Sequence, residues 1–337
     1  MTKLNTSYLG LELKNPIIAG SSNLSTDPSV LKRLEDSGAA AVVYKSLFEE
    51  QIQLERHQME EDLGEYTERH AEMISIFPKL EHAGPQQHLE NLRKAKESLG
   101  IPLIASLNAV YKESWVDYAE LLEQTGVDAL ELNFFAIPNK FEKDSKSIET
   151  EQIDILKTIV GKVKIPVSVK LSPFYTNPLH LIRQMDETGV KGFVLFNKLF
   201  QPEINVDNEK HITPWNLSEA IDKRLPLRFT GLLYKKIKAS ICSSMGIFEG
   251  RDVAAMILAG ADVVQVVSAL YKYKPEHIGK MLTDLQAWME KKGYANLEDF
   301  RGKLSAITLN DPFVYKRAQY VDALLSSEDL LKKVRLP

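Results

Sequence analysis

The stretch Thr125–Asn133 reads TGVDALELN, and it decides the fold. Gly126 follows a helical pattern around Leu121 and Leu122 and precedes a short apolar run. That order is typical of a helix that ends in a left-handed glycine and leads into a buried strand. The same pattern recurs in three more places, as SGAAA (37–41), TGVKG (188–192) and AGADV (259–263). The repeat indicates helices that alternate with strands along the chain.

Eight apolar runs are candidate strands. Two of them follow an Ile-Pro pair, at Ile101–Pro102 and Ile165–Pro166, and proline is tolerated at the first residue of a strand. The runs are nearly continuous in apolar residues, as expected for a parallel sheet covered on both faces. The predicted strands are Pro16–Ser21, Ala40–Ser46, Leu103–Leu107, Ala129–Phe134, Val167–Leu171, Phe193–Phe196, Ile237–Cys242 and Val263–Val267.

Eight strands that alternate with helices favour an α/β fold, the closed (β/α)8 TIM barrel. The alternative is an open doubly wound sheet, which we would expect to carry a glycine-rich dinucleotide fingerprint after its first strand. The residues at that point, Ala19–Asn23, read AGSSN and do not form this fingerprint. We therefore predict the barrel.

Two connections, Phe48–Gln87 and Leu199–Lys236, are too long for plain helices. Loops of this length usually act as lids or binding loops, so we expect two long βα insertions. No linker or low-complexity stretch interrupts the chain, which predicts a single barrel domain over residues 1–337. Apolar residues at helical spacing after about residue 295 predict a helical tail that packs against the barrel.

Composition narrows the class of protein. The 337 residues are 44% hydrophobic and 26% charged, with a formal net charge of -4, as in an average soluble globular protein. The single cysteine, Cys242, rules out an internal disulfide and a cysteine-rich zinc site. The charge balance offers no footprint for nucleic acid, and no segment approaches the ~20 apolar residues that span a bilayer. Without a signal-peptide core, a cytoplasmic protein with neither of these partners is expected.

Polar side chains follow the predicted strands. In a (β/α)8 barrel the active site lies at the carboxyl ends of the strands, so these side chains are the candidate site. No carboxylate and no histidine closes a strand, which disfavours paired-carboxylate hydrolases and histidine–carboxylate metal sites, so no metal is predicted. The candidates include Ser21, Lys45, Ser46, Asn108, Asn133, Lys170, Asn197, Lys198 and Ser268.

Lys45 and Lys170 each end an apolar run, where an unpaired ammonium is costly to bury. Such a lysine can form a Schiff base, act as a general base or hold a fixed charge beside a cofactor; alternatively, it extends to the surface. Asn133 and Asn197 end two other strands. Their amides can bind the flat edge of an imide or lactam, or can cap their own backbone.

The segments Ser243–Asp252 and Ala259–Leu270 span the last two strands. Barrels often bind a phosphate there on backbone amides, and the small residues would let the backbone approach a ligand; the alternative is two ordinary turns. Cys242 is expected to be a small core residue, and most histidines are expected on the surface. His70 and Glu72 could belong to a lid over the site.

Several motifs occur together in order: KNPIIAGS (14–21), YKS (44–46), LELN (130–133), VKLSP (169–173), and the two segments described above. Together they resemble the dihydroorotate dehydrogenase family, including the FMN half of dihydropyrimidine dehydrogenases. The likeness runs from about residue 5 to about residue 305. It implies a barrel that binds FMN, and a homodimer.

The resemblance also implies roles by position. Lys45 and Lys170 would be catalytic, and Lys170 would lie near the N1/O2 edge of the flavin, where a positive charge stabilises the anionic reduced form. The implied cofactor-binding residues are Ala19, Gly20, Ser21, Lys45, Ser46, Asn108, Asn133, Lys170, Asn197, Met245, Gly246, Val267 and Ser268. The implied substrate-binding residues are Lys45, Asn133, Asn139, Asn197 and Lys198.

The chain departs from the family pattern at its expected base. Family members carry Asn-x-Ser-Cys-Pro-Asn or a Ser variant, whereas Asn133 is followed here by FFAIPN (134–139), with no thiol or hydroxyl near Ala136. Proton removal from carbon normally needs a positioned base. In addition, Asn197-Lys198 replaces Asn-Ser or Asn-Thr, Met245-Gly246 replaces a glycine pair, and Val267-Ser268 replaces Gly-Thr.

The resemblance therefore predicts an FMN-dependent oxidoreductase that oxidises dihydroorotate, or a related dihydropyrimidine, to orotate in pyrimidine biosynthesis. A soluble electron acceptor is expected, because no apolar N-terminal extension is present to reach a membrane quinone. Two alternatives stay open. One is a non-catalytic or divergent flavoprotein subunit without the usual base, and the other is a barrel lyase that forms a Schiff base on Lys170.

Overall fold

Eight parallel strands close into a barrel in the computed structural model, which describes residues 2–50, 85–109, 111–134, 141–198, 201–215, 217–317 and 319–325. Each strand pairs with the next, and β13 pairs with β3, so the ring is complete and the predicted (β/α)8 fold is confirmed. The strands are β3 (Ile17–Ala19), β4 (Ala41–Val43), β6 (Leu103–Asn108), β7 (Ala129–Phe134), β8 (Val167–Leu171), β9 (Gly192–Leu195), β12 (Ser240–Ser243) and β13 (Val263–Val266). The short β5 (Leu47–Phe48) pairs with β6 beyond the end of β4.

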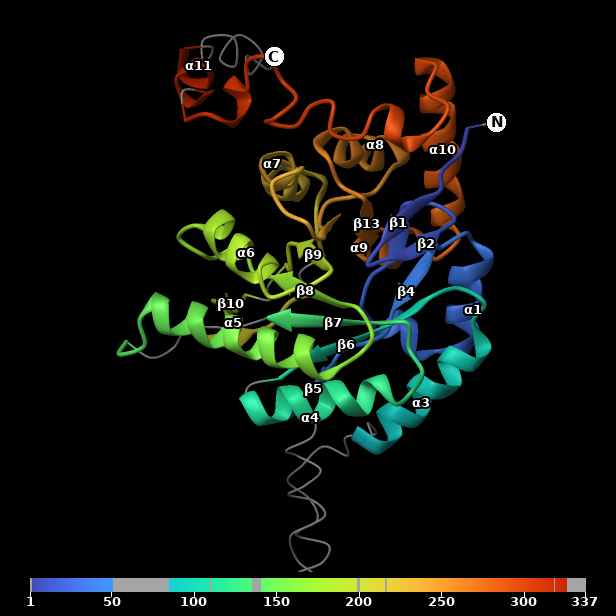
Figure 1. Cartoon of the computed structure of the whole chain (residues 1–337), viewed down its shortest axis with the longest axis vertical. Helices are drawn as coiled ribbons and strands as arrows, with labels where there is room; N and C mark the ends of the chain where they lie inside the picture. Colours follow the sequence, from blue (N-terminus) through green and yellow to red (C-terminus); the bar gives the residue numbers. More distant parts are fainter. Residues whose placement is uncertain are drawn as a thin grey trace, which may run out of the picture.

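Helices surround the strands on all sides of the ring (Figure 1). They cover its outer face, as required when parallel strands are joined by right-handed crossovers. These helices are α1 (Pro28–Asp36), α3 (Pro85–Ser98), α4 (Lys112–Glu123), α5 (Ser145–Lys162), α6 (Pro178–Asp186), α7 (Arg224–Leu233), α8 (Gly250–Ala259), α9 (Ser268–Tyr273) and α10 (His277–Lys292).

The glycines of the repeat end the helices as the sequence predicts. Gly38, Gly126, Gly189 and Gly260 follow α1, α4, α6 and α8, with φ of +100°, +84°, +93° and +122°. An L-residue with a side chain rarely adopts this conformation, so glycine allows the chain to turn sharply from helix to strand.

One strand begins later than expected. The sequence predicts a strand from Ile237, but β12 starts at Ser240. The main-chain N–H groups of Lys238 and Ala239 donate to the carboxylate of Asp186, at the end of α6, at 2.9–3.1 Å. These hydrogen bonds to a side chain take the place of the main-chain hydrogen bonds of a β-sheet for the residues before Ser240.

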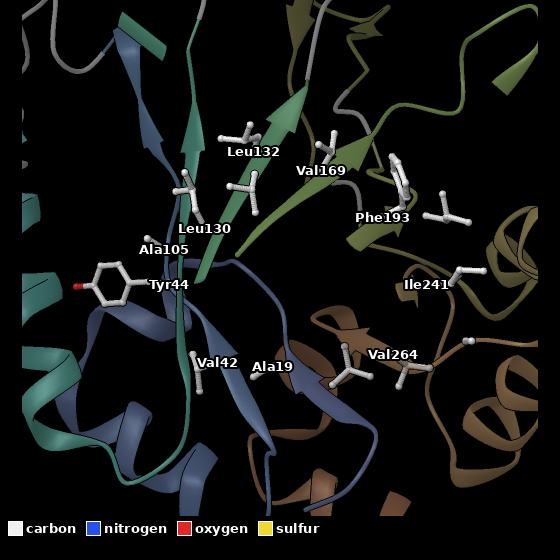
Figure 2. Close-up of a cluster of buried hydrophobic side chains, with 14 of the residues drawn as sticks. Ala19, Val42, Tyr44, Ala105, Leu130, Leu132, Val169, Phe193, Ile241 and Val264 are labelled. Carbon is white, nitrogen blue, oxygen red and sulfur yellow. The ribbon is translucent and has the colours of Figure 1, made fainter. Parts of the chain in front are cut away.

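The two faces of the barrel strands form two separate apolar clusters. Figure 2 shows the outward-facing set, to which each of the eight strands contributes, for example Ala19 on β3 and Val264 on β13. These residues pack against the surrounding helices. The inward-facing set alternates with them and includes Ile18, Ile104 and Val194. The alternation places every second residue of a strand inside the ring.

A hairpin closes the floor of the barrel. It consists of β1 (Thr6–Tyr8) and β2 (Leu11–Leu13), and its buried residues Tyr8 and Leu9 join the inward-facing cluster. Gly192, the first residue of β9, leaves room for them, because a Cβ at this position would lie 2.4 Å from Leu9 Cδ2. The inside of the barrel is therefore filled at the end where the strands begin.

The connection from β9 to β12 has structure of its own. It contains the antiparallel hairpin of β10 (Glu203–Asn205) and β11 (Lys210–Ile212), then the 3₁₀ helix η2 (Ala220–Lys223) and α7. Most of the other expected insertion, Phe48–Gln87, lies outside the described residues, and the lid residues proposed there, His70 and Glu72, lie outside them as well.

The tail runs across α8. The main-chain N–H groups of Gly302 and Leu304 donate to the carbonyls of Ile257 and Leu258, each at 2.8 Å. Phe300 is fully buried, whereas the side chain of Leu304 is 51% exposed. The elements of this part are η3 (Leu297–Asp299), η4 (Phe313–Tyr315) and α11 (Gln319–Leu325).

The close fit of the hairpin under the barrel predicts that a single methyl group added at Gly192 lowers stability. Gly192→Ala places a Cβ against Leu9 and Tyr8, so the free energy of unfolding should fall by about 1–3 kcal/mol. Urea unfolding followed by circular dichroism measures it. The matched control is Gly161→Ala in α5, where a Cβ meets nothing within 4 Å and stability should hold or rise. Equal stability of the two variants would show that the hairpin does not seal the floor.

Candidate functional site

A cavity of about 440 Å³ lies at the carboxyl ends of the barrel strands. Its volume is in the range of small-molecule sites. Every barrel strand, or the loop that follows it, contributes to the wall, together with Trp215, Leu217 and Ser218 from the connection before η2. The closed ring thus brings side chains that are far apart in the sequence into one site.

Most of the predicted site residues line this cavity. They are Ser21, Lys45, Ser46, Asn108, Asn133, Lys170, Asn197, Lys198, Met245, Val267 and Ser268. Ala19 belongs instead to the outward-facing cluster, so only its backbone can face a ligand. Gly20 and Gly246 are not among the residues that line the cavity, although their chain neighbours Ser21 and Met245 are. Asn139 and Ala136 lie outside the described residues.

A buried polar group forms the floor of the cavity. Lys170 Nζ donates to Gln265 Oε1 at 3.1 Å and lies 3.7 Å from Glu131 Oε1. Gln265 Nε2 donates to the other carboxylate oxygen of Glu131 at 2.5 Å. Glu131 is completely buried and Lys170 nearly so. The cavity therefore presents a positively charged nitrogen that is held in place from below.

Glu131 and Gln265 were not predicted as site residues, because they do not lie at the ends of the strands. Both residues lie inside a strand, two positions before a predicted site residue: Glu131 before Asn133, and Gln265 before Val267. The two-residue period of a strand places each pair on the same face. That period was a signal that could have identified them.

Three hydroxyl groups form a row along one wall. Ser21 Oγ lies 3.3 Å from Ser46 Oγ, which lies 2.6 Å from Ser106 Oγ. The next residue along the wall is Glu131, because Ser106 and Glu131 are register partners in β6 and β7. Lys45 directly precedes Ser46 in the sequence, and its main-chain N–H donates to Ser25 Oγ at 2.8 Å.

Two amides meet across the cavity wall. Asn197 Nδ2 donates to Asn133 Oδ1 at 2.9 Å. The pair can still offer a donor from Asn133 and an acceptor from Asn197. That combination is complementary to the N–H and C=O groups on the edge of an imide or lactam.

Lys198 holds the neighbouring loop by its charge. Its Nζ donates to Asp222 Oδ2 at 2.6 Å and to the Leu217 carbonyl at 3.1 Å. Burial raises the pKa of Asp222, but the Lys198 hydrogen bond and the Glu219 N–H outweigh it and leave the pKa below its usual value. These two contacts tie Lys198 to the 217–222 segment.

The loops expected to bind phosphate come together at the far side of the cavity. The Ser218 main-chain N–H donates to Ser268 Oγ at 2.8 Å. Met245 and Gly246 are both left-handed, with φ of +76° and +67°. A Cβ on Gly246 would lie 2.4 Å from the main-chain nitrogen of Lys223, so glycine is required where the loop crosses η2.

Cys242 is buried in the inward-facing cluster, which confirms that it is a core residue. Burial raises the pKa of its thiol, and the Glu131 carboxylate raises it further. His88 is an exception to the expectation that most histidines lie on the surface. Its ring is partly buried against Tyr44, with ring centroids 5.5 Å apart. Burial, and secondarily Lys45, lowers the pKa of His88 to about 4.

The described ranges contain neither a membrane-spanning helix nor a cluster of metal-ligating side chains. No helix there is long and apolar enough to cross a membrane. No group of three or more His, Cys, Asp and Glu side chains within those ranges could hold a metal ion.

The backbone at Met245 predicts an unusual order of variant stabilities. Met245→Gly and Met245→Ala lose the same side-chain contacts beyond Cβ, but only glycine relaxes the left-handed strain. We expect the glycine variant to be more stable by about 1 kcal/mol in urea unfolding. At Met256, inside α8, the same pair of substitutions should show the opposite order. The same order at both sites would contradict the assigned conformation of residue 245.

The lowered pKa of His88 predicts a loss of stability in mild acid. The unfolded chain takes up a proton near pH 6.5, whereas folded His88 does so only near pH 4. Stability is therefore complete above about pH 6.5 and falls on the order of 2 kcal/mol as the pH drops towards 4. His88→Gln should flatten this part of the stability curve, whereas His180→Gln, at an exposed position, should leave it unchanged. Identical slopes for both variants would disprove the assignment.

The chain is similar over most of its length to known enzyme subunits. It is 28% identical over 307 residues to the catalytic subunit of dihydroorotate dehydrogenase B (NAD(+)) of Thermoplasma volcanium, covering 90% of this chain and 98% of that protein. The Methanocaldococcus jannaschii protein of the same name is 26% identical over 309 residues, covering 89% of this chain and 97% of that protein. The chloroplastic dihydropyrimidine dehydrogenase (NADP(+)) of Arabidopsis thaliana is 26% identical over 357 residues, covering 95% and 81%.

A family model also matches. It is described as dihydroorotate dehydrogenase, and it covers residues 3–289, which include all eight barrel strands and every residue of the cavity wall. The resemblance inferred from the motifs is confirmed: this chain belongs to the dihydroorotate dehydrogenase family.

Proposed function

We propose that this chain is an FMN-dependent oxidoreductase that oxidises dihydroorotate, or a closely related dihydropyrimidine, to orotate in pyrimidine biosynthesis. One observation carries the proposal. The cavity of a chain from this family combines a buried ammonium, on Lys170, with the hydrogen-bonded amides of Asn133 and Asn197. The first suits a flavin, and the second suits a cyclic imide.

The residues of the cavity fit FMN. When bound, FMN supplies the acceptor for a hydride and its electrons. Lys170 would hold a positive charge beside the ring, while Ser21, Ser46 and Asn108 would line it. Gly20 allows β3 to lie directly against β13 at the wall, since a Cβ there would be 2.7 Å from Val267 Cγ2. Main-chain groups of the two loops would receive the phosphate, at Met245, Gly246, Val267 and Ser268.

The same cavity suits an anionic, planar substrate. Asn133 and Asn197 would bind its amide edge, with Asn139 as a third amide proposed from the sequence. Lys45 faces the cavity and Lys198 borders it, so the site is positive where a carboxylate would enter. These lysines would orient the substrate, and Lys198 also keeps the 217–222 loop closed against the site.

The names of the relatives suggest which electron acceptor and which kind of subunit this chain would work with. Two of them are described as catalytic subunits that use NAD(+). By analogy, we propose a soluble electron acceptor for this chain, delivered with the help of a different subunit. This arrangement is favoured over the homodimer of the sequence analysis, which, like the cytoplasmic location, stays a prediction.

Particular residues bear on the two alternative functions, the Schiff-base lyase and the non-catalytic flavoprotein. A Schiff base requires an amine that is directed at the carbonyl carbon of a substrate, whereas Lys170 Nζ donates to Gln265 and lies 3.7 Å from Glu131 Oε1. This disfavours the lyase. The non-catalytic flavoprotein is favoured by the sequence FFAIPN (134–139), which supplies no thiol or hydroxyl base.

The proposal predicts a yellow protein with a defined activity. The purified chain should carry FMN, identified by its absorption and by chromatography after heat release. Anaerobic addition of dihydroorotate should bleach the flavin band, and dihydrouracil and dihydrothymine should be compared with it. Reduction by none of the panel would favour the non-catalytic flavoprotein. A colourless protein that cannot be reconstituted with FMN would overturn the proposal.

Lys170→Met tests the role of the charge. We expect the rate of flavin reduction to fall about 10²–10³-fold, because a fixed charge at the reacting group is lost. Lys162→Met, which removes an exposed lysine from α5, is the matched control and should retain the wild-type rate. An unchanged rate in Lys170→Met would remove this lysine from the site.

A further inference from the structure

The carboxylate of Glu131, in the floor of the cavity, has no role in the function proposed above. It faces the cavity from within β7, and it is completely buried. One of its oxygens accepts from Gln265, whereas the other, Oε1, has no hydrogen-bond partner in the described part of the chain. A buried carboxylate in this state is costly unless a nearby charge stabilises it.

The nearby charge is on Lys170. Its Nζ lies 3.7 Å from the unpartnered oxygen, and Gln265 joins the two groups by accepting from Lys170 and donating to Glu131. The other titratable neighbours, Tyr8 and Cys242, are buried, and burial is the main cause that raises the pKa of both. Both therefore stay neutral, so the charge of Glu131 is opposed by Lys170.

We propose that Glu131 is the buried counter-ion and positioning residue of Lys170, and that it limits the positive charge that the cavity presents to its ligand. The ligand part of this inference rests on the proposed function. Gln265 is the link that keeps the two groups at a fixed separation. Lys170 can then direct a further N–H group into the cavity, because an ammonium has three.

This arrangement has a consequence for an anionic ligand. With Glu131 in place, the floor is close to neutral overall, and Lys170 acts at short range through its hydrogen bond. Without the carboxylate charge, the full positive charge of Lys170 acts on the cavity, and it is weakly screened there. The floor would then favour the negatively charged, reduced form of a bound flavin more strongly than the native floor does.

The decisive measurement is the midpoint potential of bound FMN. Glu131→Gln keeps the size of the side chain and removes its charge, so reduced FMN should gain about tenfold over oxidised FMN in relative affinity. This raises the two-electron midpoint potential by about 30 mV. Glu131→Asp keeps the charge and should stay closer to the wild-type potential. An unchanged or lowered potential in Glu131→Gln would overturn the inference.

A matched control separates charge from stability. Asp262→Asn removes a partly buried carboxylate that directly precedes β13, at the opposite end of the barrel from the cavity, and that lies 3.7 Å from Arg301 Nη1. It should lower the resistance to urea and leave the midpoint potential unchanged. A similar rise in potential in this variant would show that the shift is a general effect of destabilisation, and would overturn the inference.

A double-mutant cycle tests the pairing without reference to flavin. Urea unfolding of the purified protein is compared for Glu131→Gln, Lys170→Met and the double variant. If Glu131 and Lys170 are counter-ions, the double variant should lose less stability than the sum of the two single losses, because it leaves neither charge unpaired. Additive losses would overturn the pairing. If the wild-type chain binds no FMN, the proposed function fails, while this cycle still decides whether Glu131 pairs with Lys170.

Discussion

The ladder of hydrogen bonds between β13 and β3 is the constraint on which the rest of the molecule depends. It joins the last strand of the ring to the first, so that eight separate carboxyl ends point into one mouth. Without this closure, Lys45 near the start of the chain and Ser268 near its end would have no reason to share a wall. The chemistry of the site follows from the closure because the end of each strand delivers at most three polar residues.

The sequence predicted the fold well, because the fold depends on local signals. Left-handed glycines such as Gly126 and apolar runs such as the β7 strand are readable from neighbouring residues alone. The start of β12 was not readable, because it depends on Asp186, a residue more than fifty positions away that captures two main-chain donors. Interactions between distant residues compete with local preference, and a single sequence does not display them.

The candidate site was predictable to a similar extent. Residues at strand ends, such as Asn133 and Lys170, could be found because the barrel rule locates them. Glu131 and Gln265 could not be found from that rule, since they lie deeper and touch each other only after the ring closes. The role of Lys198 likewise depends on Asp222, which reaches it through the fold of the 217–223 segment. What escaped prediction is the polar residues that lie deeper inside the strands and the pairing of side chains that are distant in the sequence.

The hairpin under the barrel determines from which side the cavity can be reached. Tyr8 and Leu9 fill the ring where its strands begin, and the residues that line the cavity lie at the opposite end. In the described part of the chain, the barrel axis is therefore blocked below the cavity. A molecule cannot travel along that axis from one end of the ring to the other, so reactants that bind in the cavity approach it from the side of the carboxyl ends of the strands.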